Sequence, residues 1–256
     1  MEVHQHTHTP RKKWTHYFWE FLMLFLAVFC GFLAENFREH QLEHKREKQY
    51  MASLASELSY DLGQYEKVLN KINVLAPALD SFYQNVKNAA LFQYRLEPRW
   101  NTLINNSTAP YSPPMPTIQQ LKNSGNMRLV RDPAVEQSIM EYEAFIEGRL
   151  NKNADEVNQA AHRVYAFEDQ FCDYTDFNRA TTDNLHNKVS ENLDHAFSFE
   201  MPLLIKDPLK LNEFANSIVN YRAFLYGYYT NTLTAKEKTT ALLNLINKEY
   251  HFKNNK

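Results

Sequence analysis

The apolar stretch of residues 14–37 constrains the fold most strongly, because it is long enough and apolar enough to cross a membrane. Between Phe21 and Ala34 it contains no charged side chain. At about 1.5 Å per residue, a helix over residues 17–37 covers about 31 Å, which matches a hydrocarbon layer of about 30 Å. Aromatic residues suited to the membrane–water boundary precede it: Trp14, Tyr17 and Trp19. We therefore predict a transmembrane anchor over residues 14–37, after a polar tail of residues 1–13; a buried core helix is the alternative.

The flanks of this stretch favour an uncleaved signal anchor over a cleaved signal peptide. The basic triplet of residues 11–13 suits both, but Phe32 stands where a cleavage site ending at Ala34 needs a small residue. Basic residues lie on both sides of the stretch, which leaves two orientations open. The triplet is immediately adjacent, so we expect a single-pass protein with a cytoplasmic N-terminus and a C-terminal domain outside the cytoplasm.

One charged residue, Glu20, lies inside the predicted anchor, where a carboxylate is costly. On a helix it shares a face with His16, Ala27 and Gly31. A small-xxx-small pair such as Ala27 and Gly31 allows two membrane helices to approach closely. We predict that Glu20, Ala27 and Gly31 form a helix–helix interface, in a homo-oligomer or with another membrane protein. Snorkelling of Glu20 to the bilayer surface is the alternative.

Composition favours an all-α fold for the remainder. The chain has only 5 glycines in 256 residues, which argues for long helices. A formal net charge of -2 gives no electrostatic reason to expect a nucleic acid partner. The two cysteines are Cys30, inside the anchor, and Cys172, so we expect no disulfide. We predict an N-terminal transmembrane helix that continues into an elongated antiparallel bundle of three to four long helices, within residues 38–256.

Apolar residues recur at steps of three and four along three segments, which predicts three long amphipathic helices. Their expected ranges are about 38–95, 133–180 and 208–251, with a short helix at 117–123. The first core stripe runs from Met51 through Leu58, Leu62 and Tyr65 to Val86. Within this helix Pro77 should cause a kink or a break, and Pro98 should end it.

Helix boundaries are also marked by local signals. Asp132 and Asp207 are each followed by proline, the pattern of an N-cap followed by a first helical residue. Thr117 opens a predicted capping box, and Gly125 is a predicted helix stop. Residues 138–148 and 217–227 share the pattern Ser-Ile-x-x-Tyr-x-Ala-Phe-x-x-Gly, which predicts two equivalent helices in one bundle.

Two long connections separate the helices. Residues 98–116 contain the run PYSPPMP, in which Tyr111 lies; exposed Trp100 and Tyr111 beside prolines would suit a docking loop, and an ordinary connection is the alternative. Residues 181–206 end in an apolar run. From the helix lengths we expect the helix after Asp132 to fold back along the first. That path would return residues 181–206 toward the membrane and send the last helix outward.

Catalytic signatures are missing from the sequence. It contains no HExxH, CxxC or GxSxG motif and no phosphate-binding glycine loop, so we expect neither enzymatic activity nor a cofactor. The alternating His4, His6 and His8 are of the type that binds transition metals, but a polar tail is the simpler interpretation, and we predict no built metal site.

The segments HYFWEFLMLFLAVFCGFLAEN and REHQLEHKREKQYMASL, with the residues around LKNSGN at 121–126, carry a resemblance. In these segments the chain resembles an uncharacterised family of single-pass membrane proteins from Bacteroidota. The resemblance implies a bacterial inner-membrane protein with a helical domain and brings no activity or site residue. We therefore expect a non-enzymatic membrane-anchored bundle acting in oligomerisation or protein–protein interaction in the cell envelope. The alternative is an extracytoplasmic sensory or small-ligand-binding module that works through a partner.

Overall fold

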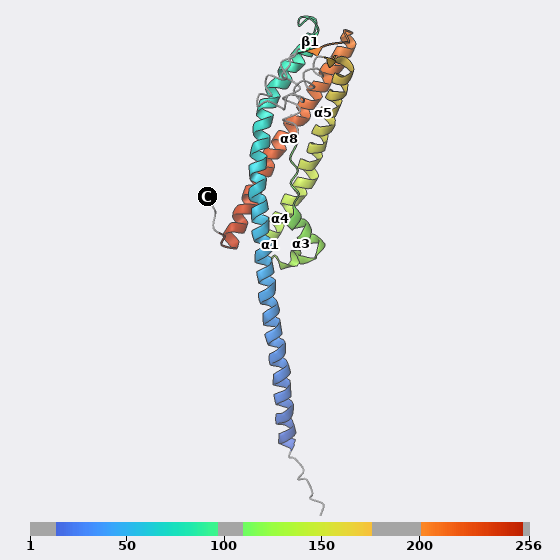
Figure 1. The fold of residues 1–256 in the computed structure, drawn as a ribbon. Helices are drawn as coiled ribbons and strands as arrows, with labels where there is room; N and C mark the ends of the chain where they lie inside the picture. The colour runs from blue at the N-terminus through green and yellow to red at the C-terminus, as the bar shows by residue number, and fades with distance from the viewer. Residues whose placement is uncertain (1–13, 97–109, 176–200, 253–256) are drawn as a thin grey trace, which may run out of the picture. The chain divides into compact units, whose positions relative to one another are not determined.

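The computed structural model describes residues 14–96, 110–175 and 201–252. The chain divides at Met51 into two compact units. Helix α1 (Trp14–Lys87) belongs to both; Figure 1 shows the helices of the second unit. The remaining elements, in chain order, are β1 (Arg95–Leu96), α3 (Pro116–Asn123), the 3₁₀ turn η1 (Asn126–Leu129), α4 (Pro133–Phe145), the π turn η2 (Ile146–Leu150), α5 (Asn151–Phe171), β2 (Met201–Pro202) and α8 (Pro208–Glu249). The all-α class is confirmed.

Helix α1 presents a continuous buried stripe from Met51 to Val86. One predicted position differs: Leu62 is half-buried, and the neighbouring Asp61 takes the core position with 4% exposure. Pro77 lies on the exposed face, and the helix continues past it to Lys87. A break is therefore wrong here. Burial of Leu75 and Leu79 on either side stabilises the helix enough to offset the lost hydrogen bond.

Two of the three predicted helix starts are confirmed by their caps. The Asp132 side chain accepts a hydrogen bond from the amide of Val135 at 2.9 Å, and the Asp207 side chain accepts one from Leu209 at 2.8 Å. The capping box at Thr117 is wrong, because α3 begins one residue earlier at Pro116 and Thr117 bonds to a different helix. Gly125 does stop α3, with a left-handed φ of 68°.

The first and last helices of the bundle run in opposite directions. Lys87 donates to Asn212 at 2.6 Å, and Lys236 pairs with Glu66 at 3.0 Å, so the start of α8 lies beside the end of α1. Apolar residues of α8 are buried from Leu211 to Ile246, and Tyr250, directly after the helix, is buried as well. In both repeated segments the isoleucine and the tyrosine of the pattern are buried: Ile139, Ile218, Tyr142 and Tyr221.

The helical segment α4–η2–α5 runs in the same direction as α1, which corrects the predicted fold-back. Near its start, Tyr142 bonds to Asp61 at 3.1 Å. At its end, the carbonyl of Phe171 accepts from the amide of Leu204, next to the β1–β2 pair that follows α1 (Figure 1). Residues 201–206 therefore lie at the end of the bundle opposite Met51, and α8 returns from there. The described ends of the connection between α1 and α3 lie toward opposite ends of the bundle, since Leu96 pairs with Met201 and Thr117 bonds to Glu57.

Two helix ends are earlier than predicted, at Lys87 instead of residue 95 and at Phe171 instead of residue 180. In both places the chain leaves the helix to form extended pairs. Strand β1 pairs antiparallel with β2, and Cys172 forms a bridge with Leu203. The predicted stop at Pro98 lies outside the described residues. A cluster of phenylalanines from three helices packs near this end: Phe82, Phe167, Phe171 and Phe214.

Candidate functional site

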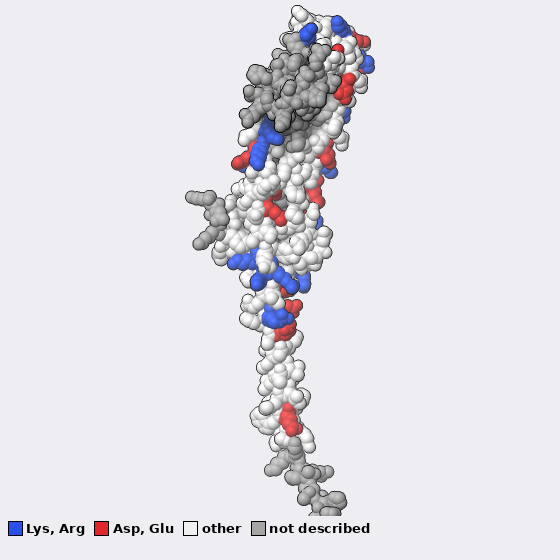
Figure 2. Space-filling model, in the orientation of Figure 1, with Lys and Arg blue, Asp and Glu red and all other residues white. Residues whose placement is uncertain are grey.

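Among the described residues, one helix is long and apolar enough to cross a membrane. This is α1, whose most apolar window has a mean hydropathy of 2.0 and no buried residue. Most large apolar side chains of this N-terminal stretch are exposed, as Trp14 and Met23 illustrate at 80% and 70%. Figure 2 shows a long stretch of this helix without charged side chains. An apolar surface of this size needs an apolar environment or another helix to cover it.

The three predicted interface residues remain accessible on α1. Glu20 forms an ion pair with His16, whose Nε2 lies 3.1 Å from the carboxylate, and both side chains are about half-exposed. Ala27 is exposed, and a methyl group added at Gly31 would meet no atom within 4 Å. The helix therefore offers space for a close neighbour along this face. The interface itself stays a prediction.

The predicted docking residue Tyr111 contacts the bundle through a short strap, which we define as residues 110–117. The Tyr111 amide donates to the hydroxyl of Tyr228 at 2.7 Å, and that hydroxyl donates back to the Tyr111 carbonyl at 2.8 Å. Burial raises the pKa of Tyr228 to about 12, which keeps this hydroxyl protonated. At the other end of the strap, Thr117 donates to the carboxylate of Glu57 through both its hydroxyl and its amide. Trp100 lies outside the described residues.

Asp61 lies beneath the strap and connects it to two helices. Its carboxylate accepts hydrogen bonds from the hydroxyls of Tyr111 and Tyr142. The ring of Tyr111 also packs edge-on against Tyr65, with centroids 5.7 Å apart. Tyr111 is thus half-buried by contacts within the chain, and a docking role for it would have to use its remaining exposed part.

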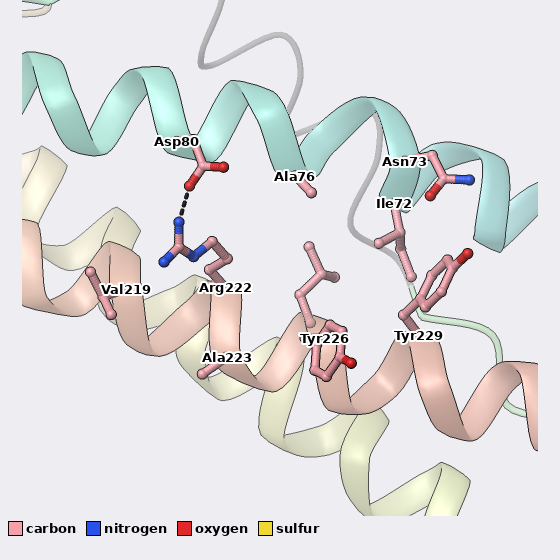
Figure 3. Close-up of a pocket in the computed structure, with 10 residues that line it drawn as sticks. Ile72, Asn73, Ala76, Asp80, Val219, Arg222, Ala223, Tyr226 and Tyr229 are labelled. Carbon is pink, nitrogen blue, oxygen red and sulfur yellow. Dashed lines mark hydrogen bonds and ion pairs between the residues drawn. The ribbon is translucent and has the colours of Figure 1, made fainter.

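A groove lies between α1 and α8, in the second unit. Figure 3 shows its walls, which enclose a volume of about 580 Å³. The residues that line it include two short side chains, Ala76 on α1 and Ala223 on α8. Tyr226 and Tyr229 flank it, and Tyr226 is 70% exposed. At one end an ion pair between Arg222 and Asp80 links the two helices.

The groove has apolar and aromatic walls. Ile72 and Leu225 contribute buried apolar surface, and the tyrosines add aromatic faces with hydroxyls at their rims. Because Pro77 has no amide hydrogen, the carbonyl of Asn73 in the groove wall lacks its usual helical donor. The residues that line the groove include no histidine, cysteine or serine, and their one carboxylate, Asp80, is paired with Arg222.

Sequence reasoning missed Asp61 and the groove for different reasons. Asp61 lies three residues after Leu58 and four before Tyr65, so its spacing already placed it on the core stripe. A carboxylate at that position signals a buried polar contact, whose partners only the fold reveals. The groove is lined by residues from two segments far apart in the sequence, and local spacing carries no signal of such a juxtaposition. His4, His6 and His8 lie outside the described residues, and the remaining described residues form no group of three potential metal ligands.

Comparison with known proteins found no matching family model, no matching curated protein and no matching solved structure.

Proposed function

We propose that this protein is a non-enzymatic, membrane-anchored helical bundle that acts through oligomerisation or contact with another membrane protein in a bacterial envelope. The observation that carries the proposal is the character of α1. Its first part is apolar and unburied, and the same helix continues into the buried core stripe that begins at Met51. One helix thus connects a segment that needs an apolar environment to a stable folded domain.

The accessible face with Ala27 and Gly31 is our proposed contact in the bilayer. Replacing each of these two residues with isoleucine would hold a neighbouring helix away from it. In native membranes, chemical crosslinking of the wild-type chain should yield a dimer or a larger adduct, and A27I/G31I should reduce its yield several-fold. Leu33→Ile, on the opposite face of the helix, is the matched control and should leave the yield unchanged. Only monomer in the wild type, with no protein recovered in pull-downs, would refute the proposal.

The groove between α1 and α8 supports a second candidate, a sensory or small-ligand-binding module that works through a partner. Its volume lies within the range of small-molecule sites. A ligand that fills it should raise the melting temperature of the full chain, because it binds the folded state alone. Ala223→Leu would fill the hollow and should abolish that shift, whereas Leu233→Ala, elsewhere on α8, should preserve it. A thermal shift that survives Ala223→Leu would place the ligand elsewhere.

A further inference from the structure

The carboxylate of Asp61 is buried among acidic and neutral groups. It is 4% exposed, and Tyr111 and Tyr142 donate hydrogen bonds to it. The titratable groups that face it, or that face its immediate neighbours, come from α1, the strap, α4 and α8: Glu57, Tyr60, Tyr65, Tyr111, Tyr142 and Tyr228. None of these groups carries a positive charge, so ionisation of Asp61 lacks an ion-pair partner within this described cluster.

This environment raises the affinity of the Asp61 carboxyl for a proton while the strap is in place. Desolvation raises the pKa of the carboxyl, the bonds from Tyr111 and Tyr142 lower it in part, and the nearby Glu57 raises it. If the strap moves away, water reaches the carboxylate and the pKa returns toward its ordinary value near 4. A group whose pKa is higher in the closed state stabilises that state at low pH, and this stabilisation is lost as pH rises through the higher pKa.

We propose that residues 110–117 act as a pH-responsive strap, held over the bundle by protonated Asp61 and released more readily when Asp61 is ionised. The strap contacts α1 at Asp61 and Glu57 and α8 at Tyr228, while Asp61 also contacts α4. Release would therefore loosen the polar links among these helices near the Met51 end of the bundle. This device goes beyond the proposed role in membrane contacts and does not depend on it.

Two backbone amides of the strap can be used to measure its opening. Prolines at positions 110, 113, 114 and 116 leave few backbone amides in it. Two of these amides donate to side chains of the bundle, Tyr111 to the Tyr228 hydroxyl at 2.7 Å and Thr117 to the Glu57 carboxylate at 3.3 Å. Both bonds break if the strap leaves, so hydrogen exchange at these amides measures its opening.

The experiment follows exchange at the Tyr111 amide in the full chain held in lipid nanodiscs, from about pH 4.5 to about pH 8, after correction for the intrinsic rate. We expect protection to fall with rising pH, by at most about tenfold per pH unit between the ordinary pKa near 4 and the raised pKa, and to level off above the raised pKa. Amides in the middle of α8 report global unfolding and should keep their protection. Constant protection of the Tyr111 amide across this range would overturn the proposal.

Two variants identify the titrating group. Asp61→Asn keeps the shape of the side chain and removes its titration, so the protection of the Tyr111 amide should become independent of pH. A wild-type slope in Asp61→Asn would also overturn the proposal. If that variant does not fold, Tyr111→Phe carries the test, because losing this donor raises the pKa of closed Asp61 further. Its loss of protection should then be larger at pH 8 than at pH 5, and an equal loss at both would contradict the mechanism.

Discussion

Gly63 and Gly125 provide a matched pair of glycine substitutions. Gly63 lies on the exposed face of α1, where an added methyl group would meet no atom within 4 Å. Gly63→Ala should therefore stabilise the fold by about 0.5–1 kcal/mol. Gly125 has equal space but a φ of 68°, so Gly125→Ala should destabilise it by about 1 kcal/mol. Urea unfolding in detergent, followed by circular dichroism, measures both. Equal changes in the free energy of unfolding for the two variants would mean that the space around the added methyl group, and not the backbone conformation, determines stability at these positions.

Asp132 gives a second prediction at the scale of single residues. Its side chain caps α4 by accepting from the Val135 amide, and Asp132→Ala should cost about 1 kcal/mol in the free energy of unfolding. Asp132→Asn retains the accepting oxygen and should cost much less. The same unfolding assay distinguishes the two. A loss of equal size in both variants would show that the charge of Asp132, and not the cap, stabilises the helix.

Helix N-caps were among the features that could be predicted best from the sequence. An aspartate before a proline specifies a cap through atoms that are adjacent in the chain, which is why Asp132 and Asp207 were predicted correctly. The predicted cap at Thr117 was wrong, because the Thr117 hydroxyl donates instead to the carboxylate of Glu57, a residue of another helix. A side chain with a strong distant partner does not act as a cap, and the distant partner cannot be read from local spacing.

At the scale of helices, Pro77 shows how tertiary packing overrides a local preference. An exposed proline in a helix interior costs about 3 kcal/mol relative to alanine, yet α1 continues through it. Pro77→Ala should stabilise the chain by about 1–2 kcal/mol, because alanine restores an amide donor but leaves the unfolded chain more flexible. Ala78→Gly, at the next position, should cost about 1 kcal/mol and confirms that the assay reports this helix. A destabilised Pro77→Ala would show that packing against α8 requires the proline.

Helix existence could be predicted, and helix direction could not. Periodic apolar residues identified the buried face of each helix, since burial follows the three-and-four spacing within one segment. Direction depends on how far the connections travel, and residues 98–116 are long enough either to turn or to return along the bundle. The bonds from the strap to Asp61 and Glu57 show that the chain returns. The groove between α1 and α8 is a consequence of this path, because it places α8 beside α1.

At the scale of the whole molecule, the two units place different demands on their surroundings. The second unit buries its stripes in a core of its own, whereas the apolar residues of the first are exposed in the described structure. Exposed apolar side chains of this extent are typical of a helix that lies in a bilayer or against a partner. This division predicts that detergent, but not high salt or alkaline carbonate, releases the full chain from membranes, as expected for a protein held by apolar contacts. Release by carbonate would argue that α1 does not span.

The orientation of the chain in the membrane is the remaining whole-molecule prediction. Basic residues 11–13 lie next to the apolar stretch, while Arg38, Lys45, Arg46 and Lys48 follow it, so the two sides compete. We expect the adjacent triplet to remain in the cytoplasm, and an enzyme reporter active only outside the cytoplasm, fused after Lys256, should be active. Replacing residues 11–13 with serine should lower that activity and raise the signal of a reporter fluorescent only inside, because the second basic group would then dominate. If the inside reporter is bright in the unmodified chain, the opposite orientation holds, and the strap would sense cytoplasmic instead of external pH.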